Sequence, residues 1–353
     1  MTHPATPDWL RRMGVELPIL QAPMAGSQGS ALAIAVSEAG GLGALPAAML
    51  SPQALRDELA AITTATHRPY NVNFFAHTPP QPDPQREAAW REALVPYFAE
   101  FRLDPAAIPP GAGRRPFDAE AAEVLEAFRP PVVSFHFGLP EPALLARVKG
   151  WGARVLSSAT TVAEARWLEA HGADVVIAQG LEAGGHRGMF LTDDLHSQLG
   201  SLALLAQVRD AVKIPVVAAG GIADARGVAA VLALGASAAQ VGTAYLCCPE
   251  ATTSAVHRRA LLTSPEAPTA LTRLFSGRPA RGLVNRLMRE LGPLSPLAPA
   301  FPLAGTALAP LRARAEAAGS CDFSPLWSGQ NRSGCSERPA AELTRFLAGR
   351  MAD

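Results

Sequence analysis

Short apolar runs alternate along this chain with segments of helical periodicity, and this alternation constrains the fold more than any other feature. The runs that predict strands cover 18–23, 41–45, 70–75, 132–137, 154–157, 174–179, 215–219 and 238–244. Helical patterns between them cover 32–39, 51–64, 142–149, 162–171, 202–212 and 225–234. Strands that alternate with helices are parallel. Eight such units predict an α/β fold of the (β/α)8 TIM-barrel type, although a six-stranded doubly wound sheet would share most of the pattern.

Two segments, 76–130 and 251–353, lie outside the repeat. The first has a proline-rich opening, two expected helices and a turn-rich linker over 108–113, and the second has helical stretches broken by prolines. Insertions after barrel strands fall on the face that carries ligands. We therefore expect a barrel made of residues 1–75 and 131–250, with a mainly helical substrate-binding cap built from the two remaining segments.

Charge and composition narrow the classes of partner. Lys plus Arg and Asp plus Glu number 31 each, without a basic block, so nucleic acid is not an expected partner. Residues 227–248 are uncharged, but Gly235 divides them into a helix and a strand, which favours barrel interior over a membrane span. The residues before Arg12 include Asp8 and no secretory signal, and the four cysteines lack CxxC spacing. These features predict a cytoplasmic protein with free thiols and no membrane partner.

Glycines follow the seventh and eighth expected strands, at 219–222 and 240–243. Backbone N–H groups and a helix dipole at these positions can bind a phosphate dianion. A single glycine pair after a strand could serve only a tight turn. The two positions together favour a phosphate site.

The sixth expected strand runs into a segment over 179–188 that contains four glycines and His186. Glycines allow a ligand to approach the backbone closely, and histidine can exchange a proton near neutral pH. His136 lies in the fourth expected strand and points away from its two phenylalanine neighbours. A lone strand histidine is either a satisfied core residue or a catalyst, whereas no apolar pattern requires His186.

Polar side chains also occur inside the expected strands. Asn71 and Asn73 alternate with Val72 and therefore face the same way, and Gln179 ends the sixth strand. Such amides either tie barrel strands together or bind a planar heteroaromatic ring. No HExxH motif, paired cysteines or carboxylate cluster is present, so a metal is not expected. Neither a GxSxG elbow nor a Walker loop is found.

The ordered motifs together resemble those of the nitronate monooxygenase family, formerly called 2-nitropropane dioxygenase. The segments that carry the resemblance are 21–24, 71–75, 158–161, 179–188, 218–222, 240–243, 275–282 and 326–330. The resemblance implies an FMN-dependent TIM barrel that oxidises alkyl nitronates with O2 to a carbonyl compound and nitrite. It implies detoxification of propionate 3-nitronate and no metal.

The resemblance also implies residue roles. His186 would be the catalytic histidine, which either accepts a carbon-bound proton or orients an anionic nitronate. His136 would act beside it and flank the flavin. Arg187 would either help with substrate charge or form a surface ion pair. Relatives often have tyrosine where this chain has Phe301, so a hydroxyl contact to substrate would be missing. FMN would contact Met24, Asn71, Gln179, Gly184, Gly221, Gln240, Val241, Gly242 and Thr243.

Two other functions fit parts of the same pattern. An FMN-dependent NAD(P)H:quinone or enoyl-thioester reductase would share the glycine positions and a similar Gly-Gly-His run. A barrel without flavin that binds a phosphorylated metabolite would share the phosphate site alone. The oligomeric state is not predicted by the sequence.

Overall fold

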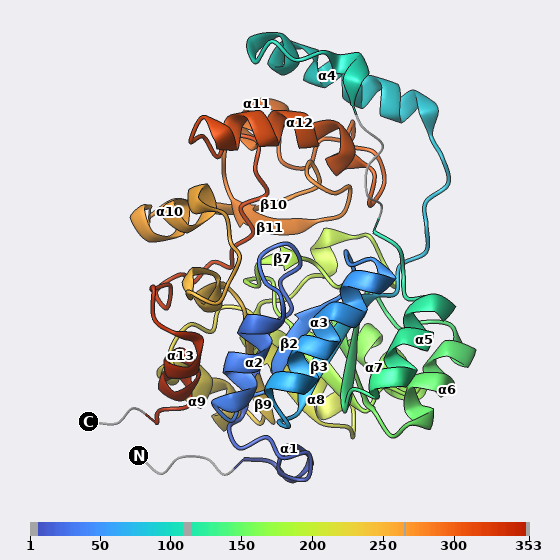
Figure 1. Ribbon diagram of the computed structural model, residues 1–353, viewed down its shortest axis with the longest axis vertical. Coiled ribbons are helices and arrows are strands. Elements are labelled where there is room, and N and C mark those ends of the chain that lie inside the picture. Colours follow the sequence, from blue (N-terminus) through green and yellow to red (C-terminus); the bar gives the residue numbers. More distant parts are fainter. Residues whose placement is uncertain (1–5, 109–113, 265, 351–353) are drawn as a thin grey trace.

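The computed structural model describes residues 6–108, 114–264 and 266–350. Its main body is a barrel of eight parallel strands, in the order β1-β9-β8-β6-β5-β4-β3-β2 (Figure 1). Hydrogen bonds from Gln21 N to Leu42 O and from Leu42 N to Ile19 O, both 2.9 Å, close the circle between β1 and the start of β2. This confirms the (β/α)8 barrel. The strands are β1 (Ile19–Gln21), β2 (Gly43–Pro46), β3 (Tyr70–Phe75), β4 (Val132–His136), β5 (Arg154–Ala159), β6 (Val175–Gln179), β8 (Val216–Ala219) and β9 (Ala238–Val241).

Helices surround the barrel, and their sequences explain where several begin. Ser51 accepts a hydrogen bond from Ala54 N at 3.2 Å, and Asp224 accepts one from Gly227 N at 2.8 Å. Such caps satisfy backbone donors that the first helical turn leaves free. The surrounding helices are α2 (Ser30–Glu38), α3 (Pro52–Ala65), α5 (Ala119–Phe128), α6 (Pro142–Gly150), α7 (Val162–Ala170), α8 (Ser201–Ala211), α9 (Ala225–Ala233) and α13 (Ala340–Leu347).

The barrel strands are buried on both faces, which explains their continuous apolar runs. In β6, Val175 and Ile177 pack in the barrel interior, whereas Val176 and Ala178 pack against the helices. Leu10 of α1 (Asp8–Arg11) belongs to the same interior cluster. The uncharged run 227–248 is divided among α9, β9 and the short 3-10 helix η3 (Thr243–Cys247). Among the described residues, no helix is long and apolar enough to cross a membrane.

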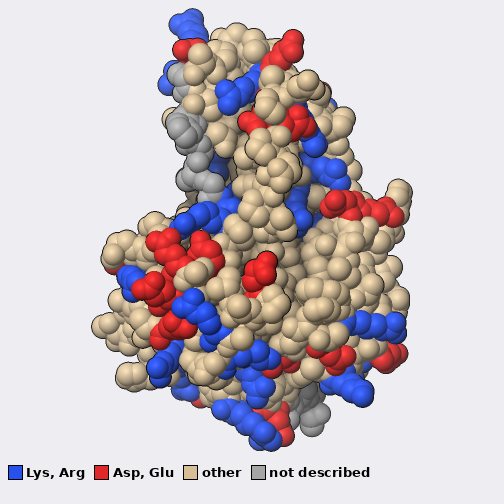
Figure 2. All heavy atoms as spheres, turned by 90° about the vertical axis from the view of Figure 1, so that its right-hand side faces the viewer, with Lys and Arg blue, Asp and Glu red and all other residues tan. Residues whose placement is uncertain are grey.

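A second lobe lies over the carboxyl ends of the strands (Figure 1). Its core joins Trp90 and Phe98 of the insertion to Leu287, Leu308 and Phe323 of the C-terminal segment. A three-stranded antiparallel sheet, not anticipated from the sequence, lies beneath the helices. Figure 2 shows the narrower lobe above the wider barrel, with acidic and basic residues interspersed. The elements are β7 (Gly185–His186), β10 (Thr269–Thr272), β11 (Ala280–Leu283), α4 (Pro84–Glu100), α10 (Ala255–Thr263), α11 (Arg286–Leu291) and α12 (Ala304–Ala317), with η1 (Pro105–Ala107) against α4. The short helix η2 (Leu195–Ser197) lies between β7 and α8 in the sequence.

Two helices in the segments expected to form the cap pack on the barrel instead. Helix α5 contacts α3 and α6, and α13 contacts α2 and α9. Their buried residues, such as Leu125 and Leu343, belong to the clusters that cover the barrel strands. We therefore propose cap boundaries that stop before α5 and before α13. Residues 109–113 of the expected linker lie outside the described residues.

Candidate active site

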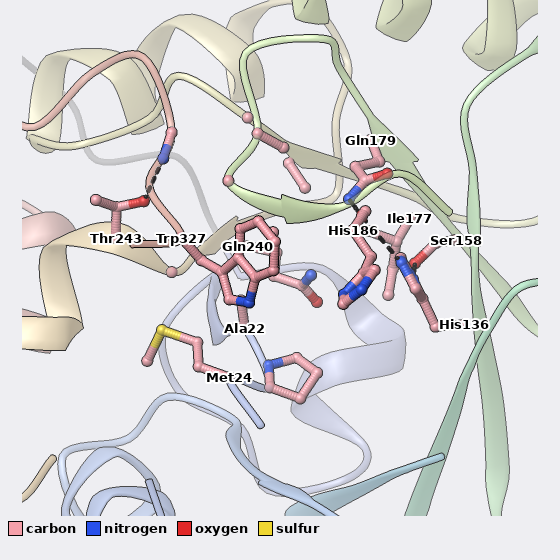
Figure 3. Close-up of a pocket in the computed structure, with 18 of the residues that line it drawn as sticks. Ala22, Met24, His136, Ser158, Ile177, Gln179, His186, Gln240, Thr243 and Trp327 are labelled. Carbon is pink, nitrogen blue, oxygen red and sulfur yellow. Dashed lines mark hydrogen bonds between the residues drawn. The ribbon is translucent and has the colours of Figure 1, made fainter. Parts of the chain in front are cut away.

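A cavity opens at the carboxyl ends of the barrel strands, beneath the cap (Figure 3). Most of the residues predicted from the sequence line it: Met24, His136, Gln179, Gly184, His186, Gly221, Gln240, Gly242 and Thr243. Asn71 and Val241 do not line it. Both are buried, Asn71 in β3 and Val241 in the core between β9 and the helices.

His186 lies in β7 and faces Ala280 of β11, so a cap strand fixes its backbone. Its Nε2 lies 2.9 Å from Ser276 Oγ, and its Nδ1 has no hydrogen-bond partner among the described residues. Burial is the main cause that lowers the pKa of His186 well below 6.5, and the charge of Arg114 is the next. The imidazole is therefore neutral near pH 7. Ser276 Oγ donates to Arg278 O at 3.3 Å, so it can accept from His186 Nε2, and in that tautomer Nδ1 is free to accept a proton.

Aromatic rings surround His186. The ring centroids of Phe301 and Trp327 each lie 5.4 Å from that of His186, and those of Phe137 and Phe75 lie 6.0 and 6.1 Å away. These rings exclude water and account for the lowered pKa. Phe301 therefore offers His186 a ring without a hydroxyl.

His136 supports the backbone of His186. Its Nε2 lies 3.1 Å from His186 O, and a carbonyl only accepts, so Nε2 carries the proton. Nδ1 then accepts from Ser158 Oγ at 3.0 Å. Burial is the main cause that lowers the pKa of His136 to about 4. A neutral His136 with both nitrogens hydrogen-bonded positions the neighbouring catalytic candidate while lining the same cavity.

Gln179 and Arg187 hold the turn that carries His186. Gln179 Nε2 donates to His186 O at 2.8 Å, and its Oε1 accepts from Gly188 N at 2.7 Å. Arg187 is fully buried and donates to Gln179 O and Gly180 O, each at 2.7 Å. Both roles expected for Arg187, contact with substrate charge and a surface ion pair, are wrong, because buried backbone carbonyls occupy its guanidinium.

The glycines after β8 and β9 form a cradle of backbone amides. Gly221 has φ +73°, which favours glycine, and a Cβ at Gly242 would lie 3.2 Å from Ala22 Cβ. Among the described residues, no acceptor is recorded for the amides of Gly221, Gly242 and Thr243. No carboxylate of the described chain lines the cavity. Unpaired amides in a cavity free of negative charge are a binding site for an anion such as phosphate.

Polar amides form another wall. Asn73 Nδ2 donates to Ser134 Oγ at 2.9 Å and lines the cavity, as does Gln240. Asn71 Nδ2 donates to the same hydroxyl at 2.8 Å, and its buried Oδ1 has no partner among the described residues. Asn73, rather than Asn71, therefore presents its side chain to a ligand.

Three side chains near His186 were not singled out from the sequence. Ser276 and Trp327 fall inside the segments that carry the family resemblance, so these motifs could have identified them as site residues. Arg114 lines the cavity from the insertion, where no periodicity or motif marked it. Its position depends on packing between distant segments.

The fold and the cavity define a TIM-barrel enzyme with an anion cradle on one side and a neutral, half-buried histidine on the other. The model of the nitronate monooxygenase family matches residues 9–348. A relative named nitronate monooxygenase from Pseudomonas aeruginosa is 44% identical over 348 residues, which cover 97% of this chain and 98% of the relative. The chain therefore belongs to the nitronate monooxygenase family, as the sequence motifs predicted, and is an oxidoreductase that acts on nitronates.

Two solved structures share this fold over nearly the whole chain. A nitroalkane oxidase from Streptomyces ansochromogenes has a TM-score of 0.88 and 43% identity, and the match covers 97% of each chain. FabK from Thermotoga maritima has a TM-score of 0.70 and 28% identity, and the match covers 96% of this chain and 93% of that one.

Proposed function

We propose that this protein uses FMN and O2 to oxidise alkyl nitronates to a carbonyl compound and nitrite. Propionate 3-nitronate is the proposed physiological substrate, and its removal is a detoxification. The observation that supports this most strongly is that the amide cradle and the neutral His186 open into one cavity. The four cysteines are free thiols, in keeping with activity in the reducing cytoplasm.

The residues of the cavity fit FMN. The free amides of Gly221, Gly242 and Thr243 suit its phosphate, and Gln240 and Asn73 offer polar groups to a heteroaromatic ring. Met24, Ile177 and Trp327 offer apolar surface to the flat ring system (Figure 3). Of the other proposed contacts, Gly184 and Gln179 line the cavity, whereas Asn71 and Val241 would act from behind its wall. When bound, FMN supplies electron transfer and reaction with O2.

His186 provides the proton chemistry in this proposal. A neutral nitroalkane must lose a proton from carbon before it becomes a nitronate, and the Nδ1 of neutral His186 can accept that proton. A nitronate that is already anionic needs no base, and His186 would then only orient it. Phe301 and Trp327 keep water from this region and strengthen the field of nearby charges.

One set of measurements tests the proposal. The purified protein should show the absorption bands of FMN, and propionate 3-nitronate should cause O2 uptake with nitrite release. NADH should not be oxidised at a comparable rate with a quinone. Absence of flavin bands after reconstitution with FMN would support a phosphometabolite-binding barrel instead.

A flavin-dependent reductase is the second candidate, and the similarity to FabK over nearly the whole chain favours it. Such an enzyme would use NAD(P)H to reduce a quinone or an enoyl thioester. Steady NADH oxidation with either acceptor, together with no O2 uptake on nitronate, would establish the reductase and exclude the monooxygenase.

A further inference from the structure

We infer that Arg114 determines substrate specificity by binding a second anionic group, at the end of the substrate away from the nitronate. The inference rests on the proposed function, since it names the part of a nitronate that this residue would recognise. A short nitronate with a carboxylate at its other end has this chemistry.

Arg114 and the next residue, Arg115, place their guanidinium groups in different environments. Arg115 is exposed and pairs with Glu120 at 3.1 Å and with Asp118 at 3.6 Å. Arg114 lines the cavity, and its guanidinium has no hydrogen bond or ion pair among the described residues. Its Cζ lies 5.8 Å from the centre of the Phe301 ring. Of these adjacent arginines, Arg115 therefore faces solvent and Arg114 faces the cavity.

The backbone near Arg114 is anchored to the barrel. Phe117 N donates to Phe75 O at 2.8 Å, and the Phe117 side chain is buried. Its ring centroid lies 4.8 Å from that of Phe74 and 5.3 Å from that of Phe135. This packing fixes the point from which Arg114 enters the cavity, as a specificity residue requires.

The charge of the cavity favours an anion. Burial lowers the pKa of Arg114, and the other nearby charge, Arg312, is also positive. Arg278, the other cation close to His186, donates to Met189 O at 3.2 Å and lies 4.3 Å from the centre of the Phe137 ring. Among the described residues that line the cavity, Arg114 is the only arginine or lysine. A partly buried cation without a counter-ion is costly, and an anionic ligand group would offset that cost.

The position of Phe301 relates the two ends of the ligand. The ring centroid of His186 lies 5.4 Å from that of Phe301 and Arg114 Cζ lies 5.8 Å from it, so the base and the cation border the same side chain. A chain of a few carbons packed against Phe301 can reach both groups, with a nitronate beside His186 and a carboxylate beside Arg114. Phe301 offers apolar contact but no hydroxyl. Recognition of the carboxylate therefore falls to Arg114.

Kinetics on two nitronates of equal chain length test the inference. Propionate 3-nitronate carries the carboxylate, and propyl 1-nitronate lacks it. In Arg114→Gln, kcat/KM for propionate 3-nitronate should fall by about 10–100-fold, as for loss of a charge-assisted hydrogen bond. For propyl 1-nitronate it should change by less than about threefold, because no charge faces the arginine. Arg114→Lys should restore part of the loss, and Arg115→Gln should behave as wild type. Equal losses on both substrates would overturn the inference.

A binding measurement separates this inference from the proposed function. Succinate resembles propionate 3-nitronate in charge at both ends and does not react, whereas butyrate has one charge. The purified holoenzyme should bind succinate more tightly than butyrate by calorimetry, and Arg114→Gln should abolish the difference. If this result appears without turnover of any nitronate, the proposed function fails and the anion site stands. If wild type binds the two acids equally, the anion site fails even where nitronate is oxidised.

Discussion

The two ends of the cavity are built in different ways. The end near β8 and β9 uses backbone amides of Gly221, Gly242 and Thr243, which come from consecutive barrel units. The end near His186 uses side chains from distant segments, including Arg114 and Trp327. The amide cradle forms wherever β8 and β9 lie side by side, because its residues directly follow these strands. The specificity pocket also requires the insertion and the C-terminal segment to pack against the barrel. The first end is suited to a cofactor, which is the same in every turnover. The second end is suited to discrimination between substrates.

The largest expected effect comes from removing the base at the cap end. His186→Ala should lower kcat/KM for a neutral nitroalkane by roughly 10²–10⁴-fold, the usual contribution of general base catalysis. The loss with the preformed nitronate should be much smaller, because that substrate has already lost its proton. Steady-state O2 uptake with both substrates measures the difference.

His196→Ala is the matched control, since His196 is exposed and does not line the cavity. It should leave both rates unchanged. Equal losses with both substrates in His186→Ala would show that His186 binds an anion and removes no proton. Both ends of the cavity would then serve only to bind anions.

A smaller effect is expected from filling the cradle. Gly242→Val places side-chain atoms beside Ala22 and Met24, which line the same cavity, and should weaken FMN binding by about 10–100-fold with little change in the selection between nitronates. The dissociation constant follows from quenching of FMN fluorescence by apoprotein. Gly227→Ala, whose Cβ would have only ordinary contacts of 3.5 Å, is the control. Unchanged affinity in Gly242→Val would place the phosphate elsewhere.

The smallest effect concerns acid stability and the histidines that the cap buries. His257 donates to Trp327 O, and burial lowers its pKa to about 4. Its folded pKa is depressed below 6.5, so the unfolded chain binds more protons at mildly acidic pH. Stability from this group is complete above pH 6.5 and declines as pH falls toward 4.

Urea unfolding at neutral pH and near pH 5 measures this effect. His257→Gln should lose less stability over that interval than wild type, by on the order of 1–2 kcal/mol. His196→Gln is the control and should follow the wild type, because His196 is exposed and does not pack in the cap. A His257→Gln variant with the full acid sensitivity of the wild type would contradict the assignment.

The barrel and its glycine positions could be predicted because their signals are local. Runs such as 174–179 and 238–244 correspond to β6 and β9, with the end of the second run in η3. Strands β10 and β11 were missed because each is short, and β11 is also stabilised by pairing with the distant strand β7, as Ala280 with His186. Arg187 was misassigned because nothing local shows that its guanidinium meets the carbonyls of Gln179 and Gly180. The burial of Arg187 arises only when the turn that carries His186 has folded.

His186 follows a barrel strand in the sequence, but its side chain hydrogen-bonds to the cap. Its strand partner is Ala280, its Nε2 neighbour is Ser276, and Trp327 packs against its ring. All three residues follow the last barrel strand in the chain. A chain that ended before them would keep the hydrogen bonds from Gln179 and His136 to the His186 carbonyl, but would lose its strand partner and the contacts of Ser276 and Trp327 with the imidazole. A fragment that carries every barrel strand is therefore expected to lack part of the packing that orients the proposed base.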